Sequence, residues 1–346
     1  VNNISVPDGK SEDEIWEIFN IVFEAIRPAD QVVFDITHAF RSIPMLAIVV
    51  LNYAKVLKNA KLKRICYGAM ESLGSIHEVR QMDLEERLVP IFELSAFDTL
   101  LEWSVGVDRF IKGGDARKIK ALAEESLVPV IKEKGAHQNT ALSLKKLAER
   151  LDRFTKVMST CRGLQITPSI EALQSALNTI TDTDLVRPFS PLVDKLRELT
   201  DRFSDDDALN GVRAARWCHE HNMVQQGYTI LQETLISHLL RMFGQDPVEE
   251  KIRSIVTSAV SIVEKNIPQP KWKGAAGQNP DLAGQLVDYL AKNRELTGLI
   301  SGLGIKRNDL NHAGMRQHAI SDPAIFSEDL KAKIDALERY LVEDAK

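Results

Sequence analysis

The chain has 346 residues, of which 44% are hydrophobic and 27% are charged, and its formal net charge is -5. This apolar content excludes disordered, collagen-like and low-complexity proteins, and the length is typical of two domains. The longest purely apolar run, Met45 to Leu51, is far too short to span a bilayer. The three cysteines are widely spaced and form no CxxC pair, so we expect no disulfide framework, no zinc site and a reducing, cytoplasmic location.

Residues 1–93 alternate between helical and strand patterns. Ser11, with Glu14 three positions on, is typical of a helix N-terminus with a capping box, and apolar residues follow at helical spacing as far as Ile26. The run 31–36 is too continuous in Val, Phe and Ile for a half-exposed strand, so it predicts a strand buried on both faces. A helix over 41–57 and a second buried strand over 62–67 complete a parallel crossover. These residues are therefore predicted to belong to a doubly wound α/β sheet.

From about residue 94 the strand patterns cease and apolar residues recur at helical spacing to the end of the chain. The predicted fold class is α/β plus all-α, with a Rossmann-like portion at 1–93 and a helical region at 94–346. Breaks are predicted at 113–114, 187–191 and 267–280, the last being the longest loop. Residues 1–93 carry 10 basic and 14 acidic side chains, and the rest carries 34 and 35, so any contact with a polyanion must be local.

The first group of residues suited to chemistry lies at 35–42, where a predicted strand ends and a helix begins. Ligands bind at the carboxyl ends of strands in open α/β sheets, and helix N-terminal amides attract phosphate. Thr37 and Ser42 offer hydroxyl groups, His38 a titratable donor and Arg41 a planar guanidinium. The group therefore suits a phosphorylated ligand. The alternative is structural: Asp35 or Thr37 caps the helix, and His38 satisfies a buried carbonyl.

A second strand end contributes to the same edge. Gly68 follows the strand at 62–67 and permits close approach of a ligand, and Glu71 can accept hydrogen bonds from hydroxyl groups. Because neighbouring parallel strands end at one edge, Gly68 and Glu71 are expected beside Thr37. Residues 83–93 join the two regions and are predicted to be either a hinge or a rigid connector.

The second group lies at 307–312, with the sequence Arg-Asn-Asp-Leu-Asn-His. On a helix, positions i+4 and i+5 return close to the face of i, so Arg307, Asn311 and His312 are expected to project together. A guanidinium and an imidazole side by side suit phosphodiester cleavage without a metal, because one balances charge on the phosphorane and the other moves a proton near neutral pH. The alternative is an ordinary solvated helix face.

Together the two groups resemble a known family. The sequence 35–41 is similar to the D-x-T-H-G-F-R signature of CRISPR-associated proteins, and 307–312 matches the R-x4-6-H signature of HEPN ribonucleases. Their order and spacing resemble the CARF-HEPN effectors of type III CRISPR systems, in which CARF denotes a CRISPR-associated Rossmann fold.

The resemblance implies an antiviral endoribonuclease that is allosterically activated by a cyclic oligoadenylate, either the tetra- or the hexa-adenylate. It implies a homodimer, possibly assembled further, that cleaves single-stranded RNA to 2′,3′-cyclic phosphate and 5′-hydroxyl ends, with no metal or other cofactor and no membrane. The implied catalytic residues are Arg307, Asn308, Asn311 and His312. The implied contacts to the messenger come from the first group: Thr37, His38, Ala39, Arg41, Gly68 and Glu71.

Two departures from the family pattern matter. Ala39 stands where the signature has Gly, and its methyl group restricts positive φ and close approach of a phosphate. A complete CARF domain also has further strands before the position of Val1, so we expect that Val1 is not the native start. Two other functions stay open: a messenger sensor without catalysis, and a ring nuclease that cleaves the messenger itself.

Overall fold

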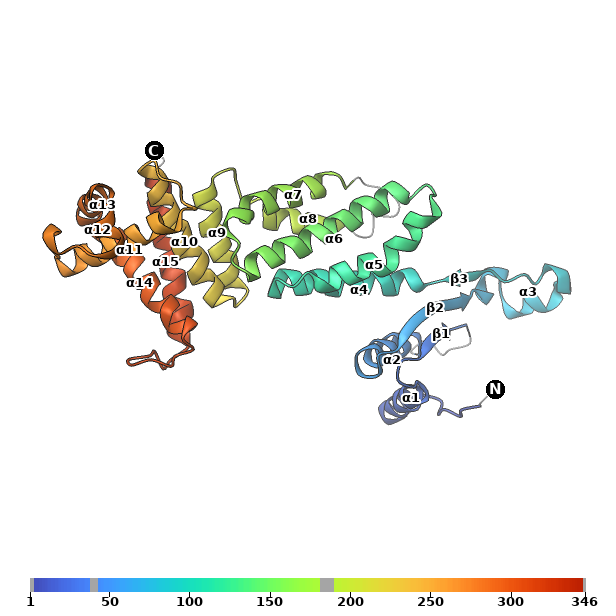
Figure 1. Ribbon diagram of the computed structural model, residues 1–346. Helices are drawn as coiled ribbons and strands as arrows, with labels where there is room; N and C mark the ends of the chain where they lie inside the picture. The colour runs from blue at the N-terminus through green and yellow to red at the C-terminus, as the bar shows by residue number, and fades with distance from the viewer. Residues whose placement is uncertain (1–2, 38–42, 181–189, 345–346) are drawn as a thin grey trace. The chain divides into compact units, whose positions relative to one another are not determined.

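The computed structural model describes residues 3–37, 43–180 and 190–344. The chain separates into two compact units, Val1–Glu102 and Trp103–Lys346. Figure 1 shows strands in the first unit and helices in the second. None of the helices in the described ranges is long and apolar enough to cross a membrane.

The first unit alternates helices and strands. In chain order its elements are α1 (Glu12–Ala25), β1 (Gln31–Asp35), α2 (Ile43–Lys58), β2 (Lys61–Gly68), η1 (Met70–Leu73), α3 (Ile76–Gln81), η2 (Leu84–Glu86) and β3 (Ile91–Glu93). The three strands form one sheet in the order β1-β2-β3. β1 pairs with β2 in parallel and β2 pairs with β3 antiparallel, so the predicted parallel crossover is confirmed.

The start of α1 follows its sequence pattern only in part. Ser11 is the N-cap, and its Oγ accepts a hydrogen bond from the backbone N–H of Glu14 at 3.2 Å. The Glu14 carboxylate accepts from the N–H of Lys10 at 2.7 Å. The complete capping box lies instead at the start of α3, between Ser75 and Glu78.

The prediction that the first strand is buried on both faces is wrong. Val32 and Phe34 pack against the cluster of buried residues that α1 and α2 form, but Val33 points the other way and is 63% exposed. Successive side chains of a strand alternate between the two faces of the sheet. Since β1 is an edge strand, and its helices pack on one face only in the described part of this unit, the other face stays open.

The connection at 83–93 is partly built into the sheet. Its last residues form β3, in which Phe92 pairs with Tyr67 of β2. Leu84 and Leu88, by contrast, are 81% and 78% exposed. The segment is therefore anchored at one end and open at the other.

All elements described after β3 are helical, as the sequence predicted. They are α4 (Ser95–Gly113), α5 (Arg117–Glu133), α6 (Gln138–Ser159), η3 (Gly163–Gln165), α7 (Ile166–Asn178), α8 (Ser190–Thr200), α9 (Asp207–Glu220), α10 (Val224–Met242), α11 (Glu250–Lys265), η5 (Gln269–Lys271), α12 (Gly274–Gln278), α13 (Pro280–Lys292), α14 (Arg294–Asn311) and α15 (Ala324–Asp344). α4 begins in the first unit and ends in the second.

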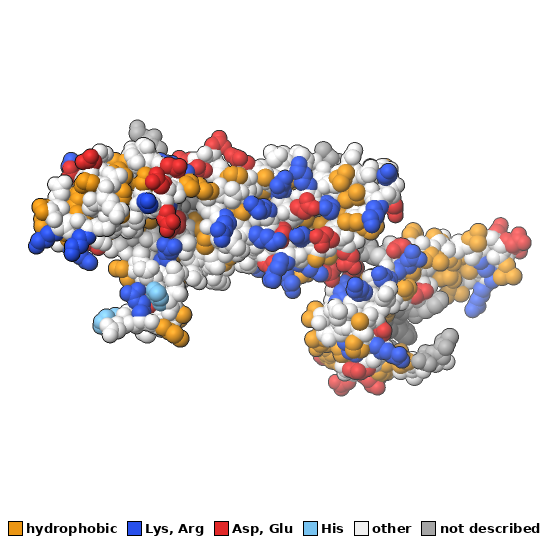
Figure 2. Space-filling view, viewed as in Figure 1, with side chains coloured by type: hydrophobic (Ala, Val, Ile, Leu, Met, Phe, Trp, Pro, Cys, Tyr) orange, Lys and Arg blue, Asp and Glu red, His pale blue; other side chains and the backbone are white. Residues whose placement is uncertain are grey.

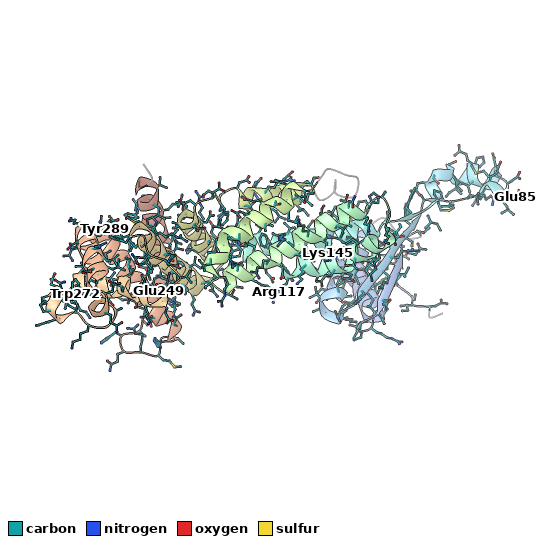
Figure 3. All side chains as sticks on the ribbon, turned by 45° about the horizontal axis from the view of Figure 1, so that its top comes forward. Glu85, Arg117, Lys145, Glu249, Trp272 and Tyr289 are labelled. Atoms are coloured by element: carbon teal, nitrogen blue, oxygen red, sulfur yellow. The ribbon has the colours of Figure 1, made fainter. Side chains whose placement is uncertain are left out.

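One continuous apolar core runs through the second unit. Trp217 of α9 and Tyr228 of α10 are among its largest fully buried side chains. The predicted loop at 267–280 contains η5 and α12, and Figure 3 labels Trp272 in it. There the indole Nε1 of Trp272 donates to the carbonyl of Ile267 at 3.0 Å. That hydrogen bond and the partly buried ring give this proline-rich segment a local fold that composition did not indicate.

Candidate functional site

In the first unit the two strand ends meet as the sequence predicted. The Oγ1 of Thr37 accepts a hydrogen bond from the backbone N–H of Gly68 at 2.7 Å, and the N–H of Thr37 donates to Oδ1 of Asp35 at 2.9 Å. A Cβ added at Gly68 would lie 3.0 Å from Cγ2 of Thr37, so glycine allows this close approach. Three predicted messenger contacts, His38, Ala39 and Arg41, lie outside the described residues.

Glu71 lies in η1, directly after this strand end. Its carboxylate accepts a hydrogen bond from the phenol of Tyr67, at the end of β2. This bond lowers the pKa of Glu71 and raises that of Tyr67. Glu71 is therefore an exposed anionic acceptor near neutral pH, which suits hydroxyl or amino groups of a ligand better than its phosphates.

In the second unit, the 307–312 group spans the last turn of α14 and faces α10 in part. Nη1 of Arg307 donates to Oε1 of Gln232 at 3.2 Å, and Oδ1 of Asn311 accepts from Nε2 of Gln225 at 2.9 Å. The later residue on α14 thus contacts the earlier residue on α10, so the two helices run antiparallel here. Arg307 and Asn311 share this helix face, as the spacing predicted.

Glu233 connects Arg307 to a second arginine. Oε1 of Glu233 lies 3.0 Å from Nη1 of Arg307, and its Oε2 is ion-paired with Nη2 of Arg253 on α11. One carboxylate thus faces two guanidinium groups. The Nε of Arg307 is buried and has no hydrogen-bond partner among the described residues. An unsatisfied buried donor is uncommon in folded proteins and makes Arg307 a candidate functional group.

His312 is the C-cap of α14, and its side chain is exposed, as is that of Asn308. The segment that follows turns back through positive φ at Ala313 and Gly314. Figure 2 shows pale-blue histidine and blue basic side chains gathered on this projecting connection between α14 and α15. The imidazole and the guanidinium of the motif therefore differ in setting, since one is in solvent and the other is packed against α10.

Asp309, which sequence reasoning had not placed in the site, fixes the base of this projecting segment. It is 4% exposed, and its Oδ2 accepts a hydrogen bond from the N–H of Ile320 at 2.9 Å. Its backbone carbonyl also accepts from the N–H of Gly314 at 3.1 Å. Asp309 thus ties both ends of the segment that follows His312.

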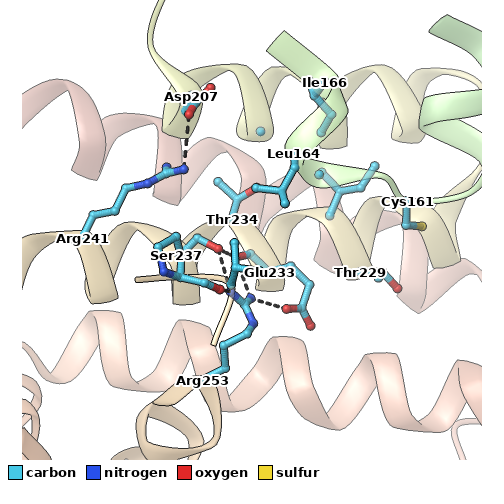
Figure 4. A pocket seen from close by; sticks show the side chains of 15 residues that line it. Cys161, Leu164, Ile166, Asp207, Thr229, Glu233, Thr234, Ser237, Arg241 and Arg253 are labelled. Atoms are coloured by element: carbon cyan, nitrogen blue, oxygen red, sulfur yellow. Dashed lines mark hydrogen bonds and ion pairs between the residues drawn. The ribbon is translucent and has the colours of Figure 1, made fainter. Parts of the chain in front are cut away.

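A cavity of about 330 Å³ adjoins Arg307 through Glu233. It is lined by residues of η3, α7, α9, α10 and α11 and of two connecting segments, and Figure 4 labels some of them. Cys161 lies on its wall. Burial raises the pKa of the Cys161 thiol, and the nearby charge of Arg307 opposes part of that rise. The thiol is therefore mainly protonated at neutral pH.

Comparison with known proteins gives two matches. A family model described as the second domain of CRISPR-associated protein MJ1674 matches residues 99–210. The CRISPR-associated protein MJ1674 of Methanocaldococcus jannaschii is 26% identical to this chain over 244 residues. Both matches support a CRISPR-associated protein. The alignment covers 68% of this chain and 33% of the relative, so the chain spans about a third of the relative's length.

Sequence reasoning found the motif but missed much of its surroundings. Four residues around the motif were not singled out, namely Gln225, Gln232, Glu233 and Arg253. One feature of the sequence could have indicated a partner for Arg307. Gln232 is a polar residue in an otherwise apolar part of α10, and it is buried, as are Leu231, Leu235 and Ile236. A buried amide needs a hydrogen-bond partner, and here the partner is Arg307.

Proposed function

We propose that the chain is part of an endoribonuclease of type III CRISPR antiviral defence, which needs no metal and is activated allosterically by a cyclic oligoadenylate. The observation that carries the proposal is the setting of Arg307. It is held against α10, retains an unused buried donor, and lies five residues before the exposed His312. The two matches to a CRISPR-associated protein support the same biological context.

The proposed chemistry uses these two side chains on single-stranded RNA. The 2′-hydroxyl attacks the adjacent phosphorus, the bond to the 5′-oxygen breaks, and the products are a 2′,3′-cyclic phosphate and a 5′-hydroxyl. The imidazole of His312 moves the proton, and the guanidinium of Arg307 balances charge on the phosphorane. In the proposed homodimer the motifs of two protomers contribute to one active site, with Asn308 and Asn311 as polar members.

The proposed activator site lies in the first unit, where Thr37 and Gly68 meet. Their hydrogen bond gives a close-packed strand edge with an exposed acceptor, Glu71, beside it. Strand ends of this kind bind nucleotides in open α/β sheets. A cyclic tetra- or hexa-adenylate would present its phosphates and ribose hydroxyls to this edge and to the predicted contacts His38, Ala39 and Arg41.

The test is cleavage of a labelled single-stranded RNA in EDTA, with cyclic tetra-adenylate, with cyclic hexa-adenylate and with neither. We expect cleavage only with one of the activators, ends that carry a cyclic phosphate, and loss of activity in Arg307→Ala and His312→Ala. The matched control is His318→Ala, which changes an exposed histidine of the same projecting segment. Activity that requires Mg²⁺, or that survives both motif substitutions, would refute the proposal.

Two further measurements, of activator binding and of activator cleavage, distinguish the two other functions. Tight binding of an activator with no RNA cleavage would indicate a sensor without catalysis. Conversion of the activator to linear products, including in the Arg307→Ala protein, would indicate a ring nuclease.

A further inference from the structure

We propose that the cavity beside Arg307 is a subsite for one RNA base that carries an exocyclic amino group, so that it sets the sequence preference of cleavage. The inference rests on the proposed ribonuclease function and adds to it the part of the substrate that is read. In RNA recognition, contacts to phosphates position the chain, whereas contacts to base edges specify its sequence.

The location of the cavity fits this role. Glu233 lines the cavity and also contacts Arg307 at 3.0 Å, so a single side chain separates the cavity from the proposed phosphate contact. Leu164 lines it from η3 and is 63% exposed, which places part of the wall at the protein surface. A base splayed out of a single strand next to the scissile phosphate is thus within reach of it.

The charged side chains that line the cavity favour a neutral ligand. The cavity is lined by two arginines and two carboxylates, and these are paired with one another: Arg253 with Glu233, and Arg241 with Asp207 at 3.2 Å. The charges within each pair cancel, so the cavity has no net positive charge that would attract a phosphate. A phosphate is better served by Arg307 next to it, whose side chain is 29% exposed and shares the one carboxylate of Glu233 with Arg253.

The size and the walls fit a single base. About 330 Å³ lies near the lower end of the roughly 300–1,000 Å³ that ligand pockets occupy, which leaves room for one flat ring system rather than two. Apolar side chains form part of the wall. Leu164 and Val248 are exposed and offer surfaces for stacking, and Ile166 and Ile230 lie beneath the surface. The hydroxyl groups of Thr229 and Ser237 form a polar part of the cavity wall.

Those hydroxyls indicate which base fits. Thr229 donates its proton to the carbonyl of Gln225 at 3.0 Å, and Ser237 donates to the carbonyl of Glu233 at 2.7 Å. Each oxygen can still accept a hydrogen bond from an incoming donor, although that of Ser237 already accepts from Arg253 and the Thr229 hydroxyl is also hydrogen-bonded to the Cys161 thiol. An acceptor-rich edge favours adenine, guanine or cytosine, whose amino group presents two N–H donors, over uracil, whose single imide N–H lies between two carbonyl oxygens that the same acceptors repel.

The experiment profiles cleavage of a randomised single-stranded RNA by the full chain with its activator. We expect uracil to be disfavoured by about three- to tenfold at one position next to the cut, as expected for one hydrogen bond. The variant Thr229→Phe, which fills the cavity, should remove this preference. Leu164→Phe provides a second filling variant from another element. Thr257→Phe is the control, because this exposed threonine on α11 makes the same kind of backbone hydrogen bond away from the cavity.

Cleavage with no base preference, or a preference that both filling variants leave unchanged, would overturn the inference while leaving the ribonuclease proposal intact. If the wild-type protein with activator cleaves no RNA, the ribonuclease proposal fails, and the subsite is tested by direct binding of cytidine and uridine monophosphates. Tighter binding of the cytidine nucleotide, lost in Thr229→Phe and kept in Thr257→Phe, would support the subsite. Equal binding of both nucleotides would refute it.

Discussion

Glu233 should contribute to the stability of the second unit because it is the shared counter-ion of two arginines. It faces Arg307 at 3.0 Å and is ion-paired with Arg253, and the three side chains are only 37%, 29% and 22% exposed. The substitution Glu233→Gln keeps the shape of the side chain and removes its charge. The amide oxygen can still accept from one guanidinium, but the amide NH₂ then faces the other.

The magnitude follows from these contacts. A hydrogen bond to a charged group contributes about 1.5–3 kcal/mol when it is well buried. Partial exposure screens the charges here, and one acceptor survives, so we expect Glu233→Gln to lower the free energy of unfolding by about 1–2 kcal/mol. For a unit of this size the melting temperature should fall by roughly 2–8 °C.

The assay is thermal and urea unfolding followed by circular dichroism, which reports mainly the helical unit. Glu149→Gln is the control, because Glu149 pairs with Lys145 one turn away on the surface of α6 and is 52% exposed. Glu149→Gln should lower the free energy of unfolding by only about 0.3–0.5 kcal/mol. A further variant, Glu233→Gln with Arg253→Met, should lose less than the sum of the two single changes because the removed partners interact.

The reasoning would be refuted if Glu233→Gln were no more destabilising than Glu149→Gln. It would also fail if the effects of Glu233→Gln and Arg253→Met were strictly additive. Either result would mean that the two arginines are adequately solvated without their shared carboxylate.

Two further predictions concern stability in the same unit. The Arg117 side chain, which donates to Asp115 at 2.8 and 2.7 Å, holds the pKa of Asp115 below its usual value, so its contribution is present above the unfolded-state pKa and is lost as pH falls through the lower folded-state pKa. Asp115→Asn should therefore destabilise the protein at pH 7, and its difference from wild type should shrink in unfolding curves as the pH falls below about 3.9, the unfolded-state pKa of an aspartate; a difference independent of pH would contradict this. Gly211→Ala should cost about 2 kcal/mol or more in urea unfolding, because the new Cβ would lie 2.1 Å from Oγ1 of Thr234, whereas Gly298→Ala in the open interior of α14 should be neutral or stabilising by up to about 1 kcal/mol. If both substitutions changed the free energy of unfolding equally, the added methyl group at Gly211 would be accommodated by a movement of α9 away from α10 that costs no stability.

The comparison of sequence with structure is clearest in the first unit. Alternation of apolar runs with a helical segment was enough to predict β1, α2 and β2 and their parallel pairing. The same pattern suggested burial on both faces of β1, which is wrong, since Val33 is exposed. A run of Val and Phe shows that a strand is stable, but it does not show how many layers cover it.

In the second unit the sequence determined that the chain is helical and that Arg307 and Asn311 share a helix face. Local spacing fixes both, because the helical repeat is a property of neighbouring residues. The sequence also placed His312 next to them, but its exposure follows from the end of α14 and the turn at Ala313 and Gly314.

Only the tertiary structure decided what surrounds Arg307. Its partner Glu233 is 74 residues away, and Glu233 in turn meets Arg253 across 20 residues. The cavity likewise needs η3, α7, α9, α10 and α11 packed together. Such contacts depend on the angle and register at which helices pack, which arise from the fit of whole apolar faces rather than from the spacing of any one motif.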